Sequence, residues 1–283
     1  CSLTTRRFNP CITLTDVFIF ERPLLVTPLF DLRKVFAKMA APNRATLFNK
    51  CLRTLKKTYE PQVPSPTRSV FEQVIFGICL ENVSLETAED SYLRLTEDYL
   101  DWNELRVSSP REIAESFSKQ EGPLEKARTL KSIMHAIFET EYNFELETLI
   151  RMTQTQAVKT LNSFDGMRPF IAAHILQTSL KAHVIPLDAI SIRAVTRLGL
   201  VDASAAIDKM SANLKRLVSK NQGPIFCSLI RQLALDVCVA DTPAIRKCAL
   251  ADVCPTAIEM ETKKKSPPEK TKKGTAKKKP KAK

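Results

Sequence analysis

The stretch FDGMRPFIAAHILQTSLKAHVIPLDAISIRAVTRL, from Phe164 to Leu198, decides the fold class. Its opening, Asp165-Gly166-Met167-Arg168-Pro169, predicts a tight turn, because glycine adopts positive φ cheaply and proline suits the first turn of a helix. The residues from about 170 to 180 are apolar on most faces and predict a buried helix. Asp188 follows Pro186-Leu187 and precedes a second helical segment, so its carboxylate either caps that helix or faces a functional surface.

Helical spacing of apolar residues recurs through most of the chain. Ser109-Pro110-Arg111-Glu112 is a capping box with proline at the first helical position and predicts a helix start. Trp102 is expected in a short loop. No stretch shows sustained period-two alternation, so the sequence predicts an all-α protein. The other expected helices are 44–59, 69–80, 84–99, 124–139, 144–152, 189–198, 203–219 and 224–237.

The composition indicates which class of protein this is, but it does not indicate a function. The chain has 283 residues, 44% apolar and 26% charged, which is ordinary for a globular protein with ample core. No apolar run approaches the ~20 residues of a membrane span. Eight cysteines without a framework-like spacing do not indicate disulfides, and Cys1, Cys11, Cys51 and Cys79 are expected to be isolated thiols.

Both ends of the chain differ from its middle. Residues 1–38 have no clean periodicity and no signal-peptide layout, and Met39 begins an ordinary-looking start, so we expect 1–38 to be upstream sequence or an irregular extension. From Glu259 to Lys283 there are eleven Lys and three Glu, which leaves a net charge of +4 for the remaining residues out of a total of +12. This tail is expected to be disordered, either adding non-specific affinity for nucleic acid or only keeping the chain soluble.

The hairpin and the aspartate together resemble the helix-hairpin-helix (HhH-GPD) DNA glycosylase superfamily, and in particular its endonuclease III branch. That family's hairpin typically reads Leu-Pro-Gly-Val-Gly-Arg-Lys-Thr-Ala, with an aspartate about 22 residues beyond the first glycine. Gly166 matches the first glycine, and Asp188 lies 22 residues after it. Arg168 replaces the second glycine and Phe170 replaces the catalytic lysine, so the chain is similar to a degenerate member.

The resemblance implies a two-lobed fold over most of the chain. Residues 39–257 would form the glycosylase-like domain. Within it, 66–183 would be a six-helix barrel lobe, and 43–60 would join 186–257 in the second lobe. Residues 258–283 would be the disordered Lys-rich tail. In the resembling family, DNA lies in the cleft between the lobes.

The resemblance also implies how the site would act. Backbone N–H groups at the hairpin's second helix would bind a DNA phosphate, with Gly166, Met167, Arg168 and Phe170 as contact residues. A phenylalanine cannot attack the sugar as the family's lysine does, so lyase chemistry is not expected. Asp188 would be the catalytic residue of a monofunctional enzyme, stabilising an oxocarbenium-like sugar. Without that role, Asp188 is a helix N-cap and the hairpin a plain αα-turn.

Three further groups of polar residues bear on the expected site. Arg193 and Arg197 lie four apart after Asp188 and could contact phosphate or simply face solvent. Glu81 and Asn82 are polar candidates near the lesion-facing segment of the family, although a surface role fits Glu81 better. The three histidines, His135, His174 and His183, show no metal-like spacing.

A cysteine motif near the C-terminus supports the resemblance and argues against its cofactor. The family's iron–sulfur loop places cysteines at offsets 0, 7, 10 and 16. Here Cys238, Cys248 and Cys254 occupy three of these positions, and Ile245 occupies the fourth. A [4Fe–4S] centre requires four thiolates, so we expect either no cluster or a labile one held by the three cysteines. Without a cluster, packing of Val237, Ile245 and Leu250 would hold the loop.

Two functions remain open on the sequence. The first is a base-excision-repair DNA glycosylase that flips a damaged or mismatched base and hydrolyses its bond to the sugar with Asp188. The second is a catalytically inactive DNA-binding or damage-recognition protein of the same fold. An unrelated helical scaffold would leave the cysteine spacing and the Gly166–Asp188 separation as coincidences. In either function the expected partner is double-stranded DNA, and the protein is expected to be monomeric, cytoplasmic and nucleoid-associated.

Overall fold

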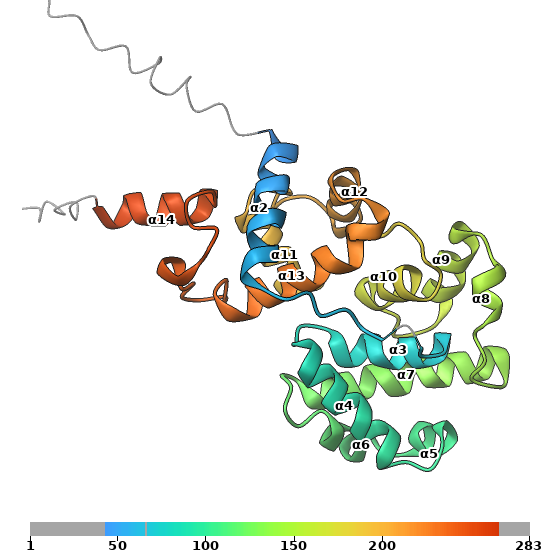
Figure 1. The fold of residues 1–283 in the computed structure, drawn as a ribbon. Helices are drawn as coiled ribbons and strands as arrows, with labels where there is room; N and C mark the ends of the chain where they lie inside the picture. Colours follow the sequence, from blue (N-terminus) through green and yellow to red (C-terminus); the bar gives the residue numbers. More distant parts are fainter. Residues whose placement is uncertain (1–42, 66, 266–283) are drawn as a thin grey trace, which may run out of the picture. The chain divides into compact units, whose positions relative to one another are not determined.

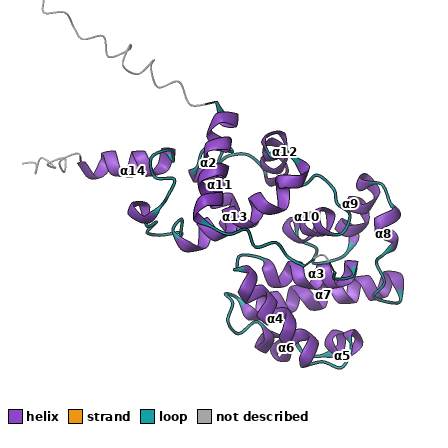
Figure 2. Cartoon of the chain, in the orientation of Figure 1, coloured by secondary structure: helices purple, strands orange, loops and turns teal. Residues whose placement is uncertain are grey.

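The computed structural model describes residues 43–65 and 67–265 (Figure 1). The predictions for residues 1–38, and for the tail beyond Lys265, lie outside the described residues. Helices are the only regular secondary structure in this part of the chain, which contains no strand (Figure 2). The predicted all-α class is therefore confirmed.

The helices of the described residues follow one another with short connections. They are α2 (Arg44–Thr58), α3 (Val70–Leu80), α4 (Leu85–Glu97), α5 (Trp102–Val107), α6 (Pro110–Ser116), α7 (Pro123–Glu141), α8 (Thr148–Arg151), α9 (Gln154–Ser163), α10 (Pro169–Thr178), α11 (Ala189–Arg197), α12 (Ile207–Leu217), α13 (Gly223–Asp236) and α14 (Pro255–Lys265), with 3₁₀ turns η1 (Lys220–Gln222) and η2 (Ile245–Lys247).

Local sequence signals explain where these helices begin. Ser109 and Glu112 form the predicted reciprocal capping box at the start of α6. The same arrangement occurs at Ser69 with Glu72 before α3, and at Thr153 with Gln156 before α9. Each box satisfies backbone N–H groups that the first helical turn leaves without partners.

Three local expectations were wrong. Trp102 does not lie in a loop but opens α5, which Asp101 caps, and its ring packs against Phe71 with centroids 5.6 Å apart. The helix expected over 144–152 is reduced to α8, because Phe144 is used to pack on Phe71 (centroids 4.6 Å apart) rather than to extend a helix. Helix α14 also continues to Lys265, inside the segment expected to be a tail.

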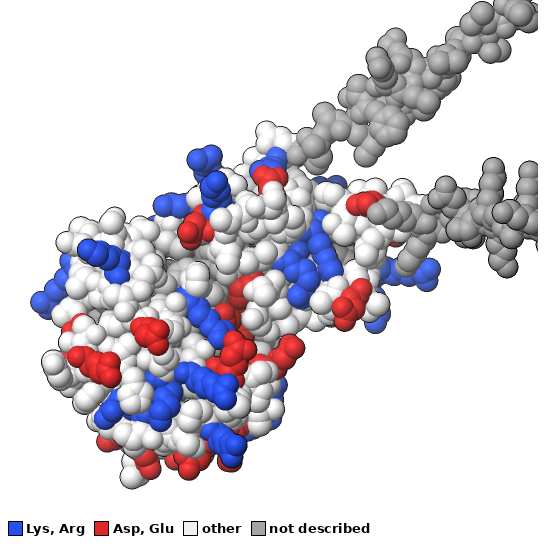
Figure 3. Space-filling view, turned by 180° about the vertical axis from the view of Figure 1, so that it is seen from behind, with Lys and Arg blue, Asp and Glu red and all other residues white. Residues whose placement is uncertain are grey.

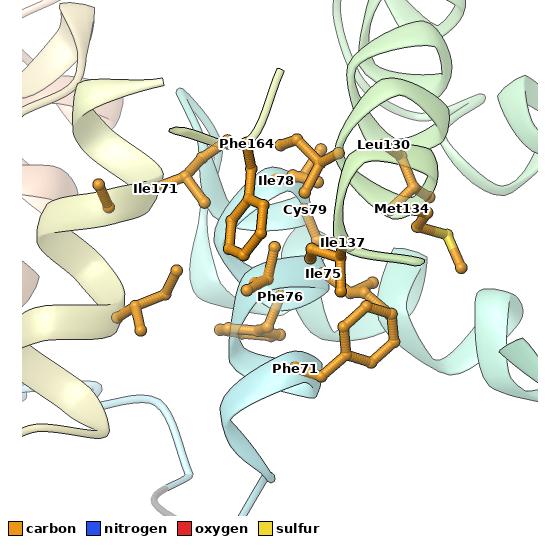
Figure 4. Packing of buried hydrophobic residues seen from close by; sticks show 14 of the residues in the cluster. Phe71, Ile75, Phe76, Ile78, Cys79, Leu130, Met134, Ile137, Phe164 and Ile171 are labelled. Atoms are coloured by element: carbon orange, nitrogen blue, oxygen red, sulfur yellow. The ribbon is translucent and has the colours of Figure 1, made fainter. Parts of the chain in front are cut away.

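The core is divided into two hydrophobic clusters, and this division defines the two lobes. The first surrounds α3, whose residues are almost all buried, and includes Phe71, Ile75 and Phe76 packed against Phe164 and Ile171 (Figure 4). The second surrounds α13 and joins the early helix α2 to the helices after residue 184. The predicted two-lobed arrangement, with an early helix returning to pack on the C-terminal half, is confirmed.

Candidate functional site

The turn between α9 and α10 is a helix-hairpin-helix built around Gly166. Gly166 has φ +82°, a conformation that side chains with a Cβ rarely adopt. A Cβ at this position would also lie 3.0 Å from the Cβ of Ser132 on α7. Met167 N–H donates to the Phe164 carbonyl at 3.1 Å and closes the turn. The sequence therefore requires glycine here for two independent reasons.

The start of α10 has the arrangement of an anion site. Pro169 occupies the first turn, and no side chain caps the helix. In the part of the chain that the structure describes, the backbone N–H groups of Phe170 and Ile171 have no acceptor. Free N–H groups at a helix N-terminus favour a phosphate or carboxylate through direct hydrogen bonds and the helix dipole.

Arg168, expected to contact phosphate, is already paired inside the protein. Its Nη1 lies 3.0 Å from Glu81, and its Nη2 lies 2.8 Å from Glu125 and 2.9 Å from the Thr129 hydroxyl. A phosphate at the hairpin would compete with two carboxylates for this guanidinium. Acidic and basic side chains are also interspersed on the face seen in Figure 3, rather than separated into one basic surface.

Asp188 is the N-cap of α11, and its carboxylate is sealed inside the protein. Oδ1 accepts from Ser191 N–H at 3.0 Å, and Oδ2 accepts from Asn82 N–H at 2.9 Å. Oδ2 also lies 2.8 Å from Nη1 of Arg231, and the Asp188 side chain is 0% exposed. Burial alone would raise the pKa of Asp188, but the Arg231 charge and the hydrogen bonds outweigh burial and hold it below its ordinary value.

Arg231 is the functional residue that the sequence prediction missed. It lies on α13 and is 8% exposed overall. Its Nη1 also donates to the carbonyls of Leu80 (2.8 Å) and Val83 (3.0 Å), at the end of α3. Its guanidinium carbon lies 5.4 Å from the centre of the Phe170 ring. An arginine within the apolar sequence of α13 was the available signal, because a buried guanidinium needs a buried partner.

The turn after α3 carries the rest of this network. Asn82 adopts φ +63°, and its side-chain oxygen accepts from Ile190 N–H at 3.4 Å. Lys126 is buried and donates to the carbonyls of Ile78 (3.2 Å) and Glu81 (2.7 Å). Burial lowers the pKa of this lysine to about 8. Lys126 and Arg231 together cap the C-terminus of α3, so the turn is fixed by two cations.

Arg193 and Arg197 hold the cysteine loop through its main chain. Arg193 donates to the carbonyls of Cys238 (2.9 Å) and Ala234 (3.2 Å). Arg197 donates to the carbonyls of Val239 (2.5 Å) and Ala240 (2.6 Å). These contacts favour a structural role, and the predicted phosphate contact of the two arginines stays a prediction.

The three cysteines of the motif lie in one region but make thiol contacts. Cys254 Sγ donates to the Arg197 carbonyl at 3.2 Å, and Cys238 Sγ accepts from Arg197 Nη1 at 3.6 Å. Burial raises the pKa of Cys248 and Cys254, and the neighbouring thiols add to that effect. The described residues contain no group of three or more potential ligands placed to hold a metal ion.

The remaining histidines are engaged elsewhere. His174 Nε2 and Gln73 Oε1 lie 3.1 Å apart in the first core cluster, and His183 Nε2 lies 2.7 Å from the Val218 carbonyl. His135 is half-buried on α7. None of the described helices is long and apolar enough to cross a bilayer.

A cavity of about 200 Å³ adjoins the sealed aspartate. It lies between α10 and α13, and its lining includes Phe170, His174 and Arg231. The start of α10 therefore lies at one end of a hollow that runs along the same helix.

Solved structures with this arrangement of helices are DNA glycosylases. A trapped endonuclease III–DNA covalent intermediate has a TM-score of 0.60 and 17% identity, over 77% of this chain and 98% of the other. A non-covalent endonuclease III–DNA complex also has a TM-score of 0.60, with 18% identity over the same shares. A thermostable thymine-DNA glycosylase has a TM-score of 0.56 and 15% identity, over 76% and 97%.

The chain has the helix-hairpin-helix glycosylase fold. The resemblance drawn from Gly166 and Asp188 is thus confirmed at the level of the fold. No family model and no curated protein sequence matches the chain.

Proposed function

We propose that this protein is a glycosylase-like DNA-binding protein of base-excision repair type, which recognises duplex DNA and does not hydrolyse the glycosidic bond. The observation that carries the proposal is that the Asp188 carboxylate is buried and fully paired. Its carboxylate is 0% exposed, paired with Arg231 and bonded to two backbone N–H groups. A carboxylate in this position cannot approach a sugar carbon without first losing the contacts that hold it.

Electrostatics supports the same conclusion. Glycosidic bond cleavage develops positive charge on the sugar, and an enzyme accelerates it with negative charge that is not already neutralised. Arg231 lies 2.8 Å from Asp188, so the pair presents almost no net charge. The cation would also repel an oxocarbenium ion formed beside it.

Lyase chemistry has no nucleophile at the position where the resembling family has its catalytic lysine. Phe170 occupies it, and the ring is 4% exposed. A Schiff base requires an amine that reaches C1′, which a phenyl ring does not supply. Lys126 lies near Asp188, but its amine donates hydrogen bonds to the carbonyls of Ile78 and Glu81, and Lys126 does not line the cavity.

DNA contact is proposed at the hairpin. The free N–H groups of Phe170 and Ile171 would bind a phosphate, with Gly166 and Met167 shaping the approach. Arg168 would contribute only after exchanging Glu125, its more exposed partner, for the phosphate. We extend the proposal to a monomer acting on double-stranded DNA in the nucleoid.

The cysteine loop is proposed to work without an iron–sulfur cluster. The thiols of Cys238, Cys248 and Cys254 do not fit one, because Cys238 and Cys254 are hydrogen-bonded to Arg197 and Ile245 supplies no ligand. Burial also raises the pKa of Cys248 and Cys254, which favours their neutral thiols. Val237 and Leu250 are buried in the second cluster, and Ile245 packs against it. Packing and the two arginines would hold the loop instead.

A monofunctional glycosylase is the second candidate, favoured by the cavity beside Phe170 and Arg231. Catalysis would then require DNA binding to draw Arg231 away from Asp188. This requirement separates the two functions experimentally.

The test is strand cleavage and binding measured on the same labelled duplexes, carrying a panel of damaged and mismatched bases. We expect salt-sensitive binding and no cleavage, with or without hot alkali. Cleavage that needs alkali, and that disappears in an Asp188→Asn variant which still binds the same duplexes, would establish the second candidate. An exposed-pair variant, Asp202→Asn, controls for the loss of one carboxylate. Absence of binding to every duplex would overturn both functions.

A further inference from the structure

Arg168, at the start of α10, has two carboxylate partners that differ sharply in exposure. Its Nη1 lies 3.0 Å from Glu81, whose side chain is 12% exposed. Its Nη2 lies 2.8 Å from Glu125, whose side chain is 74% exposed. The Arg168 side chain itself is 33% exposed. The guanidinium therefore connects an inner carboxylate on one element to an outer carboxylate on another.

The inner contacts hold the guanidinium to the protein. Nη2 also donates to the hydroxyl of the buried Thr129 at 2.9 Å. Lys126 donates to the main-chain carbonyl of Glu81 at 2.7 Å and so fixes the position of that residue. Solvent and salt screen a partly buried ion pair less than an exposed one. If the contact with Glu125 were lost, Glu81 and Thr129 would keep Arg168 in place, with one N–H group of Nη2 unpaired.

Glu125 loses little when it leaves Arg168. An ion pair between exposed side chains contributes little to stability and weakens as salt is added. Glu125 also lies in the first turn of α7, where the helix dipole favours a negative charge without any partner. The outer carboxylate is therefore the one that an external anion can replace.

A DNA phosphate is an anion of the right kind for this exchange. Carboxylate and phosphate oxygens both accept charge-assisted hydrogen bonds from arginine. Arg168 is the N-cap residue of α10, next to the N–H groups at which we have proposed phosphate binding. In the free protein, Glu125 already provides that guanidinium with an anion.

We propose that Glu125 is an internal competitor of the DNA phosphate. It occupies Arg168 in the free protein, and DNA binding displaces it while Glu81 and Thr129 keep the guanidinium in position. The inference rests on DNA binding at the hairpin and names the residue that limits its affinity. Removing the Glu125 carboxylate should therefore tighten DNA binding, whereas removing a residue that contacts DNA would weaken it.

The test compares the DNA affinity of the full chain with that of Glu125→Gln, by fluorescence anisotropy with one undamaged labelled duplex. Glutamine keeps the length of the side chain and removes its charge. We expect Glu125→Gln to bind about fivefold more tightly, because an exposed ion pair no longer has to be broken. Glu139→Gln is the control, since it removes an exposed carboxylate from the last turn of the same helix. Screening should limit its effect to less than about twofold.

Two further variants separate the contact from the general effect of charge. Glu125→Asp keeps the negative charge but is shorter by one methylene group, so it should lose the 2.8 Å contact and also bind more tightly. In an Arg168→Gln background there is no guanidinium to release. Glu125→Gln should then gain no more affinity than Glu139→Gln does.

The outcomes separate this inference from the proposed function. Salt-sensitive binding by the unaltered chain, with no larger gain in Glu125→Gln than in Glu139→Gln, would overturn the competitor role and leave the proposed function standing. A gain that persists in the Arg168→Gln background would also overturn it. So would Glu125→Asp with unaltered affinity, because charge rather than contact would then limit binding. No binding to the duplex by any of these chains would overturn the proposed function and this inference with it.

Discussion

Asp188 shows how one buried side chain can perform several structural tasks at once. It caps α11, receives the Asn82 N–H from the other lobe and pairs with Arg231. An uncompensated charge in that position would be costly, because burial removes the solvation of the partner left behind.

Replacing Asp188 by asparagine should therefore destabilise the protein strongly. We expect Asp188→Asn to lower the free energy of unfolding by about 3–5 kcal/mol, since Arg231 would remain buried without its counter-charge. Asp202→Asn, which removes an ion pair whose two side chains are 46% and 60% exposed, should cost at most about 1 kcal/mol. Urea unfolding of both variants checks this, and equal losses would contradict the buried pair as the source.

The same pair has a consequence for acid stability. The folded-state pKa of Asp188 is lower than its ordinary value of 3.8, so its contribution to stability is fully present above that pH. The contribution is lost as the pH falls through the lower folded-state pKa.

His174 should govern stability at higher pH than the carboxylate does. Burial, with the charges of Arg231 and Arg68, lowers its pKa from 6.5 to about 3. Between these values the unfolded chain binds a proton that the folded chain does not, so stability falls as pH decreases. From pH 6.5 to 5 the loss should be about 2 kcal/mol.

Unfolding in urea at pH 7 and pH 5 measures this loss. His174→Gln should reduce the difference between the two pH values. His135→Gln, at a half-buried position on α7, is the control. A pH dependence unchanged in His174→Gln would show that another group carries it.

At the scale of elements, the hairpin depends on a backbone conformation and on the space around it. Gly166 combines φ +82° with close contact to α7, whereas Gly122 has φ +63° and its nearest neighbour would lie 3.8 Å from an added Cβ. Comparing substitutions at the two glycines therefore separates the free-energy cost of a positive φ from the cost of a steric clash with α7.

Gly166→Ala should therefore be the more damaging of the two substitutions. Gly122→Ala should cost about 1 kcal/mol, from positive φ alone. Gly166→Ala should cost about 1–3 kcal/mol beyond that and should weaken DNA binding severalfold, because the shifted turn displaces the N–H groups at the start of α10. Urea unfolding and anisotropy with one duplex measure both effects. Equal DNA affinity for the two variants would argue against the hairpin as the contact.

The sequence predicted most elements and the hairpin, because capping boxes, prolines and apolar spacing act within a few residues. It failed for α5 and for residues 144–152, where the packing of Trp102 and Phe144 on Phe71 decided the local structure. Those contacts join residues far apart in the chain, and no local pattern reveals them.

The candidate site was predictable only in part, for a similar reason. Spacing located Gly166, Phe170 and Asp188, but the partner that decides the state of Asp188 is Arg231 on α13. Whether this carboxylate faces solvent or a guanidinium depends on how α11 packs against α13 within the second lobe, and sequence separation carries no information about that.

At the scale of the whole molecule, charge is concentrated in the C-terminal sequence. Residues 266–283 contain eight Lys and one Glu, a net charge of +7 out of the chain's +12. Neutralising phosphates with such charges releases counterions and makes affinity depend steeply on salt.

Removing residues 266–283 should weaken DNA binding and flatten its salt dependence. The slope of log K against log salt should become less negative by up to about 6, if every net charge contacts a phosphate. The control replaces the same residues with a glycine–serine segment of equal length, which should behave like the truncation. An unchanged slope would assign the affinity to the folded part.

The contact of Arg231 with both Asp188 and the Phe170 ring also limits which substitutions this chain tolerates. A lysine at position 170 would add a buried cation close to Arg231, whose carboxylate partner is already neutralised. Removing Arg231 first would leave Asp188 charged and alone. Each single substitution passes through a less stable protein, so a lysine at position 170 requires a coupled change at position 231.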